Sequence, residues 1–193
     1  MKIILASKSP RRKEILKNMG FDFEVITADT DESSDVTDPE SLVQILAVRK
    51  GKAVQGVCDC EDTLIISCDT VVSCDGKILG KPLNVEEAKA MLQMLSGRSH
   101  TVLSGLSLFY NGKTISGVEK TDVYFGNMPE SFIDSYVASG DSMDKAGGYA
   151  VQGRTALYID KIDGCYFNVV GLPVRLLTKL MGNLGIDLNA CLL

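Results

Sequence analysis

The stretch Leu64-Ile65-Ile66-Ser67-Cys68-Asp69-Thr70-Val71-Val72 is a run of apolar and β-branched residues that contains a single carboxylate. Such a run predicts a strand that is buried on both faces of a sheet. Because an unpaired carboxylate is costly to bury, we expect Asp69 at the mouth of the strand, beside a cation or a metal. There it is a candidate general base. A structural carboxylate that binds nearby backbone is the alternative.

Helical and strand patterns alternate on both sides of this run, which is typical of α/β proteins. Strands are expected over residues 2–6, 22–26, 64–72, 101–110, 114–125 and 156–162. Helices are expected over residues 10–19, 39–54, 129–139 and 173–184, with one more that Asn84 caps. Asn111-Gly112 is a hairpin signal, whereas other strands are joined through helices. The sequence therefore predicts a mixed sheet with flanking helices.

Composition limits the classes of protein that the chain can belong to. It has 193 residues, 45% of them hydrophobic, and a net charge of −5. At about 150 residues per domain, we expect residues 1–193 to form one domain with two lobes. An acidic chain is a poor nucleic-acid binder, and no apolar stretch approaches the roughly 18 residues that span a bilayer. Since no signal-peptide core follows Met1, we expect a cytoplasmic protein that binds neither nucleic acid nor membranes.

The six cysteines show no spacing that indicates a disulfide framework. A zinc site built from Cys58, Cys60, Cys68 and Cys74 is one alternative, although Cys68 lies in the apolar strand run. We favour buried or incidental thiols.

The segment Ser7-Lys8-Ser9-Pro10-Arg11-Arg12-Lys13 places cations at the start of a predicted helix. A helix N-terminus carries partial positive charge and favours acids, so this arrangement conflicts with the local rule. A bound anion would resolve the conflict, because backbone N–H groups, the Ser7 hydroxyl and the Arg11 and Arg12 guanidinium groups could hold it together. The strand–loop–helix context favours such a phosphate site over a solvated basic turn.

Two lysines and a glycine-rich segment also depart from local rules. Lys50 falls on the apolar stripe of its predicted helix, where it either extends to the rim or points into a cleft at an anion. Lys81 lies between Gly80 and Pro82 and could act as a point charge beside a phosphate. Residues 144–153 contain three glycines, which permit close backbone approach to a ligand. Gln152, in the same segment, offers an amide for a planar base edge, although a plain connecting loop is the alternative.

The combination resembles the Maf family of nucleoside triphosphate pyrophosphatases, nearly end to end. The blocks that carry the resemblance are residues 6–14, 31–32, 46–50, 69–72, 80–82, 95–100, 144–153 and 168–173. The resemblance implies an elongated α/β fold whose two lobes flank a central cleft, similar to inosine triphosphatases. It also implies hydrolysis of a nucleoside triphosphate to the monophosphate and pyrophosphate with a divalent metal, Mg²⁺ or Mn²⁺, and is compatible with a homodimer.

By the same resemblance, roles can be assigned residue by residue. The catalytic residues would be Asp69, Glu32, Lys50 and Lys81. The substrate-binding residues would be Ser7, Arg11, Arg12, Thr70, Lys145 and Gln152. Asp69 would activate the attacking water, and Glu32 would hold the metal with Asp69 or orient the water. Lys50 and Lys81 would neutralise charge as pyrophosphate leaves.

Specificity rests on Arg12, Thr70 and Gln152, which match the branch of the family that resembles dTTP/UTP pyrophosphatases. The sister branch, which acts on 7-methyl-GTP, has glutamine after the strand aspartate and glutamate in place of Gln152. One departure from the family is Gly51, where alanine is usual. The alternatives are a pyrophosphatase for 7-methyl-GTP or another modified nucleotide, and a non-catalytic nucleotide-binding regulator of septum formation.

Overall fold

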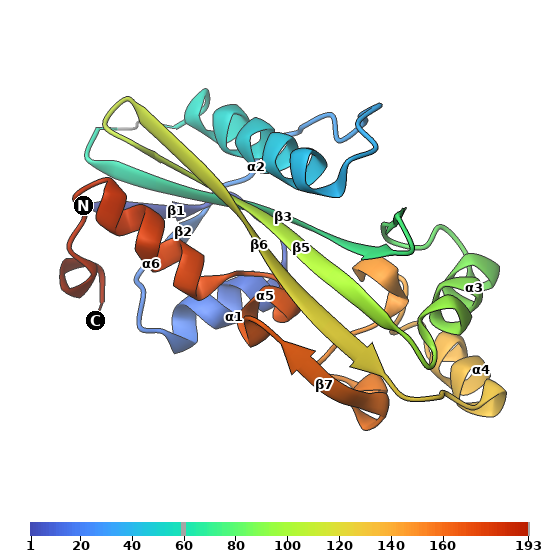
Figure 1. Cartoon of the computed structure of the whole chain (residues 1–193). Coiled ribbons are helices and arrows are strands. Elements are labelled where there is room, and N and C mark those ends of the chain that lie inside the picture. The colour runs from blue at the N-terminus through green and yellow to red at the C-terminus, as the bar shows by residue number, and fades with distance from the viewer. Residues whose placement is uncertain (59–60, 193) are drawn as a thin grey trace. The chain divides into compact units, whose positions relative to one another are not determined.

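The computed structural model describes residues 1–58 and 61–192 (Figure 1). The chain divides into two compact units. The first consists of Met1–Asp69, Ser104–Glu119 and Gly171–Leu193, and the second of Thr70–Leu103 and Lys120–Val170. The prediction that residues 1–193 act as a single domain stays a prediction. In the part of the chain that is described, no helix combines the length and the apolar character needed to cross a membrane.

A seven-stranded sheet has the strand order β2-β1-β3-β5-β6-β7, with β4 paired to β3. The strands are β1 Lys2–Leu5, β2 Glu24–Val25, β3 Thr63–Cys74, β4 Lys77–Leu79, β5 Ser99–Tyr110, β6 Lys113–Phe125 and β7 Ile159–Asp163. The helices are α1 Pro10–Asn18, α2 Pro39–Gln55, α3 Val85–Leu95, α4 Glu130–Ala138, α5 Tyr166–Val170 and α6 Val174–Asn183. Short 3-10 turns are η1 Ala146–Gly148, η2 Arg154–Tyr158 and η3 Leu188–Cys191. Since β1 pairs in parallel with β2 and β3, whereas β4 and β7 pair antiparallel, the predicted mixed α/β sheet is confirmed.

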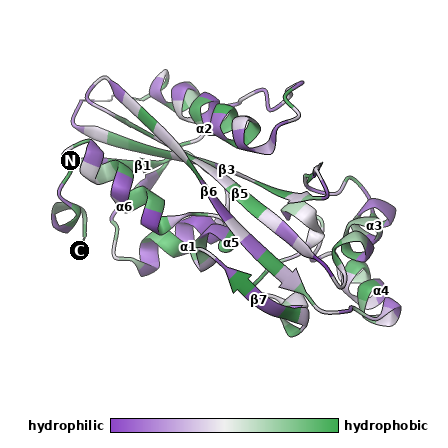
Figure 2. Cartoon of the chain, in the orientation of Figure 1, coloured by the Kyte–Doolittle hydropathy of each residue, from purple (hydrophilic) through white to green (hydrophobic). Residues whose placement is uncertain are grey.

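In the first unit, β1 and the start of β3 are buried on both faces, as their unbroken apolar runs predict. Helix α2 packs so closely on β5 that a Cβ at Gly105 would lie 2.1 Å from the backbone oxygen of Val43. Helix α6 packs on β6 at Gly117, and in Figure 1 α2 and α6 lie on opposite sides of these strands. Figure 2 shows apolar and polar residues alternating around α6, as a helix with one buried face requires.

The family departure at Gly51 has a packing reason. A Cβ on this residue of α2 would lie 2.0 Å from the Phe109 ring of β5 and 2.6 Å from the Ser67 hydroxyl of β3. The Ser67 hydroxyl in turn donates a hydrogen bond of 2.8 Å to the backbone oxygen of Ala47 on α2. The centre of α2 therefore lies directly on the sheet, and the Phe109 ring occupies the space that an alanine methyl group would need.

In the second unit, α3 and α4 cover an apolar cluster to which β3, β5 and β6 contribute. The predicted cap of α3 is confirmed, because the Asn84 side chain accepts a hydrogen bond from the Glu87 N–H. The Glu87 carboxylate accepts from the Leu83 N–H, one residue before the cap. Lys89 on α3 forms ion pairs with Glu130 and Asp134 on α4.

The prediction of a strand over residues 156–162 is only partly right. The chain first forms η2, and β7 begins at Ile159 and reaches Asp163. The sequence analysis also did not predict α5, whose Asn168 is fully buried and donates to the backbone oxygen of Val102 and to the Thr121 hydroxyl. These partners are more than 40 residues away along the chain, so local periodicity does not signal them.

His100, the single histidine, is buried in the second unit at 3% exposure. Its ring lies 5.4 Å from the Phe125 ring and 5.2 Å from the Tyr149 ring, measured between centroids. A hydrogen bond of 2.7 Å joins His100 Nε2 and the Tyr149 hydroxyl. Burial opposes protonation and lowers the pKa of His100 to about 4.

His100 should therefore make the protein less stable in mild acid. Between its ordinary pKa of 6.5 and the folded value of about 4, the unfolded chain binds the proton more tightly. The free energy of unfolding should fall by up to roughly 3 kcal/mol across this window, and this contribution should level off below it. Urea unfolding of the native chain and of His100→Gln across these pH values measures the difference. Equal pH slopes for the two proteins would contradict the expectation.

Candidate functional site

Asp69 is buried in the interior of β3, at 8% exposure. The expectation that it lies at the strand's mouth was wrong, because β3 continues to Cys74. The expected cationic partner is present: Lys50 Nζ on α2 lies 2.5 Å from Asp69 Oδ1. Asp69 and Ser67 share one face of β3, since side chains alternate along a strand, and this face contacts α2. Because α2 packs directly on the sheet, Lys50 lies next to Asp69.

Glu32 joins the same ammonium group from another part of the chain. It lies between β2 and α2, is 61% exposed, and its Oε1 atom is 3.1 Å from Lys50 Nζ. One ammonium group therefore lies between two carboxylates, of which one is buried and the other exposed. The three charges sum to −1, so the cluster suits a further cation.

The chemistry of the Asp69–Glu32 pair is compatible with a divalent metal that takes its remaining ligands from elsewhere. Mg²⁺ commonly binds one or two carboxylates and completes its shell with phosphate oxygens and water. Here two carboxylates lie close enough to share one ammonium group, and two is a number of protein carboxylates that such a shell can use. Among the described residues, no group of three or more His, Cys, Asp or Glu side chains could hold a metal. The alternative zinc set is thus not assembled by Cys58, Cys68 and Cys74, and Cys60 lies outside the described residues.

Arg12 on α1 lies beside the residue that precedes Asp69. Its Nε atom donates to the backbone oxygen of Gly171 at 2.8 Å, and its Nη1 atom donates to that of Cys68 at 2.6 Å. The same Nη1 atom lies 3.2 Å from the Ser7 hydroxyl, which also accepts from the Ser9 N–H. Ser7 is buried, at 7% exposure. The guanidinium group therefore joins three segments of the first unit and is fixed in place by them.

Of the remaining predicted site residues, Arg11 lies in the first unit, and the second unit contains Thr70, Lys81, Lys145 and Gln152. Arg11 is half-buried on α1, next to Arg12. Thr70 is half-buried and follows Asp69 on β3, whereas Lys81 and Gln152 are exposed in the second unit. Lys145 is ion-paired to Asp144 at 2.5 Å and also donates to the backbone oxygen of Asp141.

The structure brings two of the predicted binding segments together in the second unit. The Gly147 N–H donates to the backbone oxygen of Gly80 at 2.9 Å. This hydrogen bond joins the segment that carries Lys145 and Gln152 to the segment that carries Lys81.

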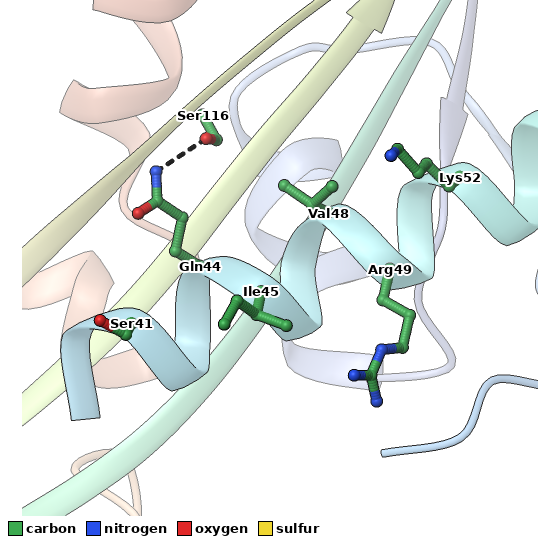
Figure 3. Close-up of a pocket in the computed structure, with 7 residues that line it drawn as sticks. All are labelled: Ser41, Gln44, Ile45, Val48, Arg49, Lys52 and Ser116. Atoms are coloured by element: carbon green, nitrogen blue, oxygen red, sulfur yellow. Dashed lines mark hydrogen bonds between the residues drawn. The ribbon is translucent and has the colours of Figure 1, made fainter. Parts of the chain in front are cut away.

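A surface pocket of about 590 Å³ lies on α2, and none of the predicted site residues lines it (Figure 3). It is lined by Ser41, Gln44, Ile45, Val48, Arg49, Lys52 and Ser116. The Gln44 amide donates to the Ser116 hydroxyl at 2.8 Å. Arg49 donates instead to the backbone on either side of Glu32, a contact that the sequence analysis missed. In the sequence, the one indication that Arg49 belongs to the site is its position next to Lys50.

Comparison with known proteins identifies the family of this chain. Residues 2–184 match the family model described as Maf-like protein. The chain therefore belongs to the Maf-like family.

Curated relatives span nearly the whole chain. A protein of Bacillus cereus (strain AH820) named dTTP/UTP pyrophosphatase is 42% identical over 189 residues, covering 97% of this chain and 98% of its own. One of the same name from Pelotomaculum thermopropionicum is 46% identical over 187 residues, covering 95% and 96%. Among solved structures, the Staphylococcus aureus Ham1 protein has a TM-score of 0.46 at 15% identity, over 65% of this chain and 72% of its own.

The contacts of Arg12 predict that it stabilises the fold. Lysine has one ammonium group and cannot reproduce the planar, separated donors of arginine, so Arg12→Lys loses guanidinium hydrogen bonds to the backbone oxygens of Cys68 and Gly171. We expect the free energy of unfolding to fall by about 1–3 kcal/mol. The control is Arg175→Lys on the exposed side of α6, which should change it by less than about 0.5 kcal/mol. Equal effects in denaturant unfolding would contradict the proposed backbone role.

Proposed function

We propose that this chain hydrolyses dTTP and UTP to the monophosphate and pyrophosphate. The observation that carries the proposal is the Lys50 ammonium group between Asp69 and Glu32, next to the segment that Arg12 and Ser7 hold in place. Membership of the Maf-like family supports it, as do relatives named dTTP/UTP pyrophosphatase at 42% and 46% identity. A cytoplasmic location and a homodimeric assembly belong to the same proposal.

In the proposed reaction a water molecule attacks the α-phosphorus of the nucleotide. Its oxygen forms a bond to phosphorus, the bond from phosphorus to the bridging oxygen breaks, and pyrophosphate leaves. Asp69 accepts the proton of the water through Oδ2, while its Oδ1 atom stays on Lys50. Because Lys50 fixes one oxygen, the carboxylate is held in one orientation towards the water.

Charge on the phosphates needs positive partners throughout the reaction. We assign Ser7, Arg11 and Arg12 to phosphate binding, since a helix N-terminus and guanidinium groups suit anions. Lys50 and Lys81 would neutralise the leaving pyrophosphate. A divalent ion, Mg²⁺ or Mn²⁺, would polarise the phosphate oxygens when bound, and Asp69 and Glu32 are the residues that would hold it.

Base recognition is assigned to the second unit. A glutamine amide can pair with the alternating C=O and N–H groups of uracil or thymine, whereas a glutamate carboxylate suits the N–H donors of guanine. Gln152 is exposed and therefore accessible to a base. Thr70 and Lys145 complete the proposed binding set by family resemblance.

The proposal predicts that pyrophosphate release is concentrated on dTTP and UTP. The measurement compares dTTP, UTP, CTP, GTP, 7-methyl-GTP and ITP with Mg²⁺ or Mn²⁺. Turnover led by a purine would contradict the assigned specificity.

The role of Asp69 as the base has its own test. Asp69→Asn should abolish turnover while nucleotide affinity stays within about tenfold, because the amide cannot accept the proton. Native-like activity in Asp69→Asn would remove Asp69 as the base.

A second prediction concerns the base-reading amide. Gln152→Glu should lower kcat/KM for dTTP and UTP by about 1–3 kcal/mol, because the carboxylate offers no donor to a pyrimidine carbonyl. Since the residue is exposed, the unfolding midpoint should not change. Gln55→Glu on α2 adds the same charge and serves as the control. An unchanged pyrimidine preference in Gln152→Glu would show that this amide does not read the base.

A further inference from the structure

Glu32 belongs to a segment that has no helix or strand to hold it. Between β2 and α2, residues 26–38 form neither element, and most of their side chains are exposed. The segment also contains several other acids, namely Asp29, Asp31, Asp35 and Asp38. Their mutual repulsion and the conformational freedom of an exposed loop both oppose a fixed position for Glu32. A single ion pair from an exposed carboxylate is a weak anchor.

Arg49 supplies the missing anchor through the backbone. Its Nη1 atom donates to the backbone oxygen of Asp31 at 2.6 Å and to that of Ser33 at 2.9 Å. These two oxygens flank Glu32 along the chain. The Asp31 carboxylate accepts a hydrogen bond of 2.8 Å from the Ser33 N–H, which closes a turn around Glu32.

Consecutive residues of α2 thus hold Glu32 in two ways. Arg49 binds the backbone on both sides of it, and Lys50 binds its carboxylate. Successive side chains leave a helix about 100° apart, so two neighbours can hold a loop and point into a site at once. Figure 3 shows Arg49 and Lys52 leaving α2 in different directions. Lys52 is exposed and lies on the same helix, so it provides a matched cation outside this contact.

We propose that Arg49 is a positioning residue that holds the turn at residues 31–33, so that the Glu32 carboxylate stays on Lys50 beside Asp69. The proposal rests on the proposed function for its effect on catalysis. The hydrogen bonds of Arg49 are with the loop backbone, and it is assigned no contact with the nucleotide or the reacting atoms. Its contribution should therefore appear only through Glu32.

Kinetics test this dependence. Arg49→Ala should lower kcat about tenfold and change KM for dTTP by less than about threefold, because the nucleotide contacts remain. Lys52→Ala should leave both constants within about twofold. In a Glu32→Gln background, Arg49→Ala should cause less than about a further twofold loss, since the group that it positions is already disabled. Losses that multiply in the double variant, or an Arg49→Ala enzyme that matches Lys52→Ala, would overturn the proposal.

Proteolysis tests the same contact without any turnover. A glutamate-specific endoprotease cleaves after Glu32 only when the turn opens, and mass spectrometry reports cleavage at this bond. Arg49→Ala should be cut about tenfold faster than the native chain, and Lys52→Ala at the native rate within about twofold. Equal cleavage in all three proteins would overturn the proposal. If the native chain turned over none of the nucleotides, the proposed function would fail and this measurement alone would decide the role of Arg49.

Discussion

The burial of one carboxylate is the constraint on which the first unit depends. Asp69 lies inside β3 and needs a cation within reach, because an unpaired buried charge is costly. Lys50 can meet that need only if α2 lies directly on the sheet. The glycines at positions 51 and 105 allow this close approach, since a methyl group at either would collide with Phe109 or with the backbone of Val43. The close packing of α2 on the sheet and the ion pair between Lys50 and Asp69 therefore depend on each other.

Arginines in the site act mainly on the backbone. Arg12 binds carbonyl oxygens of two segments, one of them directly before Asp69, and Arg49 binds the two that flank Glu32. A guanidinium group suits this work because its planar donors reach several acceptors at once. Asp69 and Glu32 both pair with Lys50 through their carboxylates. The backbone next to each acid is bound by an arginine, Arg12 beside Asp69 and Arg49 beside Glu32. Catalytic geometry can depend on such contacts as much as on the acids themselves.

Much of the fold follows from local patterns. The apolar run at residues 64–72 predicts the central strand, Asn111-Gly112 predicts the β5–β6 hairpin, and Asn84 predicts the start of α3. The turn residues Asn111 and Gly112 both have positive φ, which asparagine and glycine tolerate. Local patterns do not predict segments whose conformation depends on residues far away in the sequence. One such segment is α5, where the buried Asn168 binds Val102 and Thr121.

The sequence by itself determined the mixed α/β class, the family and the residue types of the site, because periodicity, turn signals and motif order are properties of the chain. Only the tertiary structure decided that Lys50 binds Asp69 and Glu32, that Arg12 binds backbone, and that Arg49 belongs with them. Arg49 has no signature of its own, because a surface arginine on a helix looks the same in sequence whether it meets solvent or a loop. Its role follows from the return of residues 31–33 to α2, and that return is a contact across the fold, which no local pattern encodes.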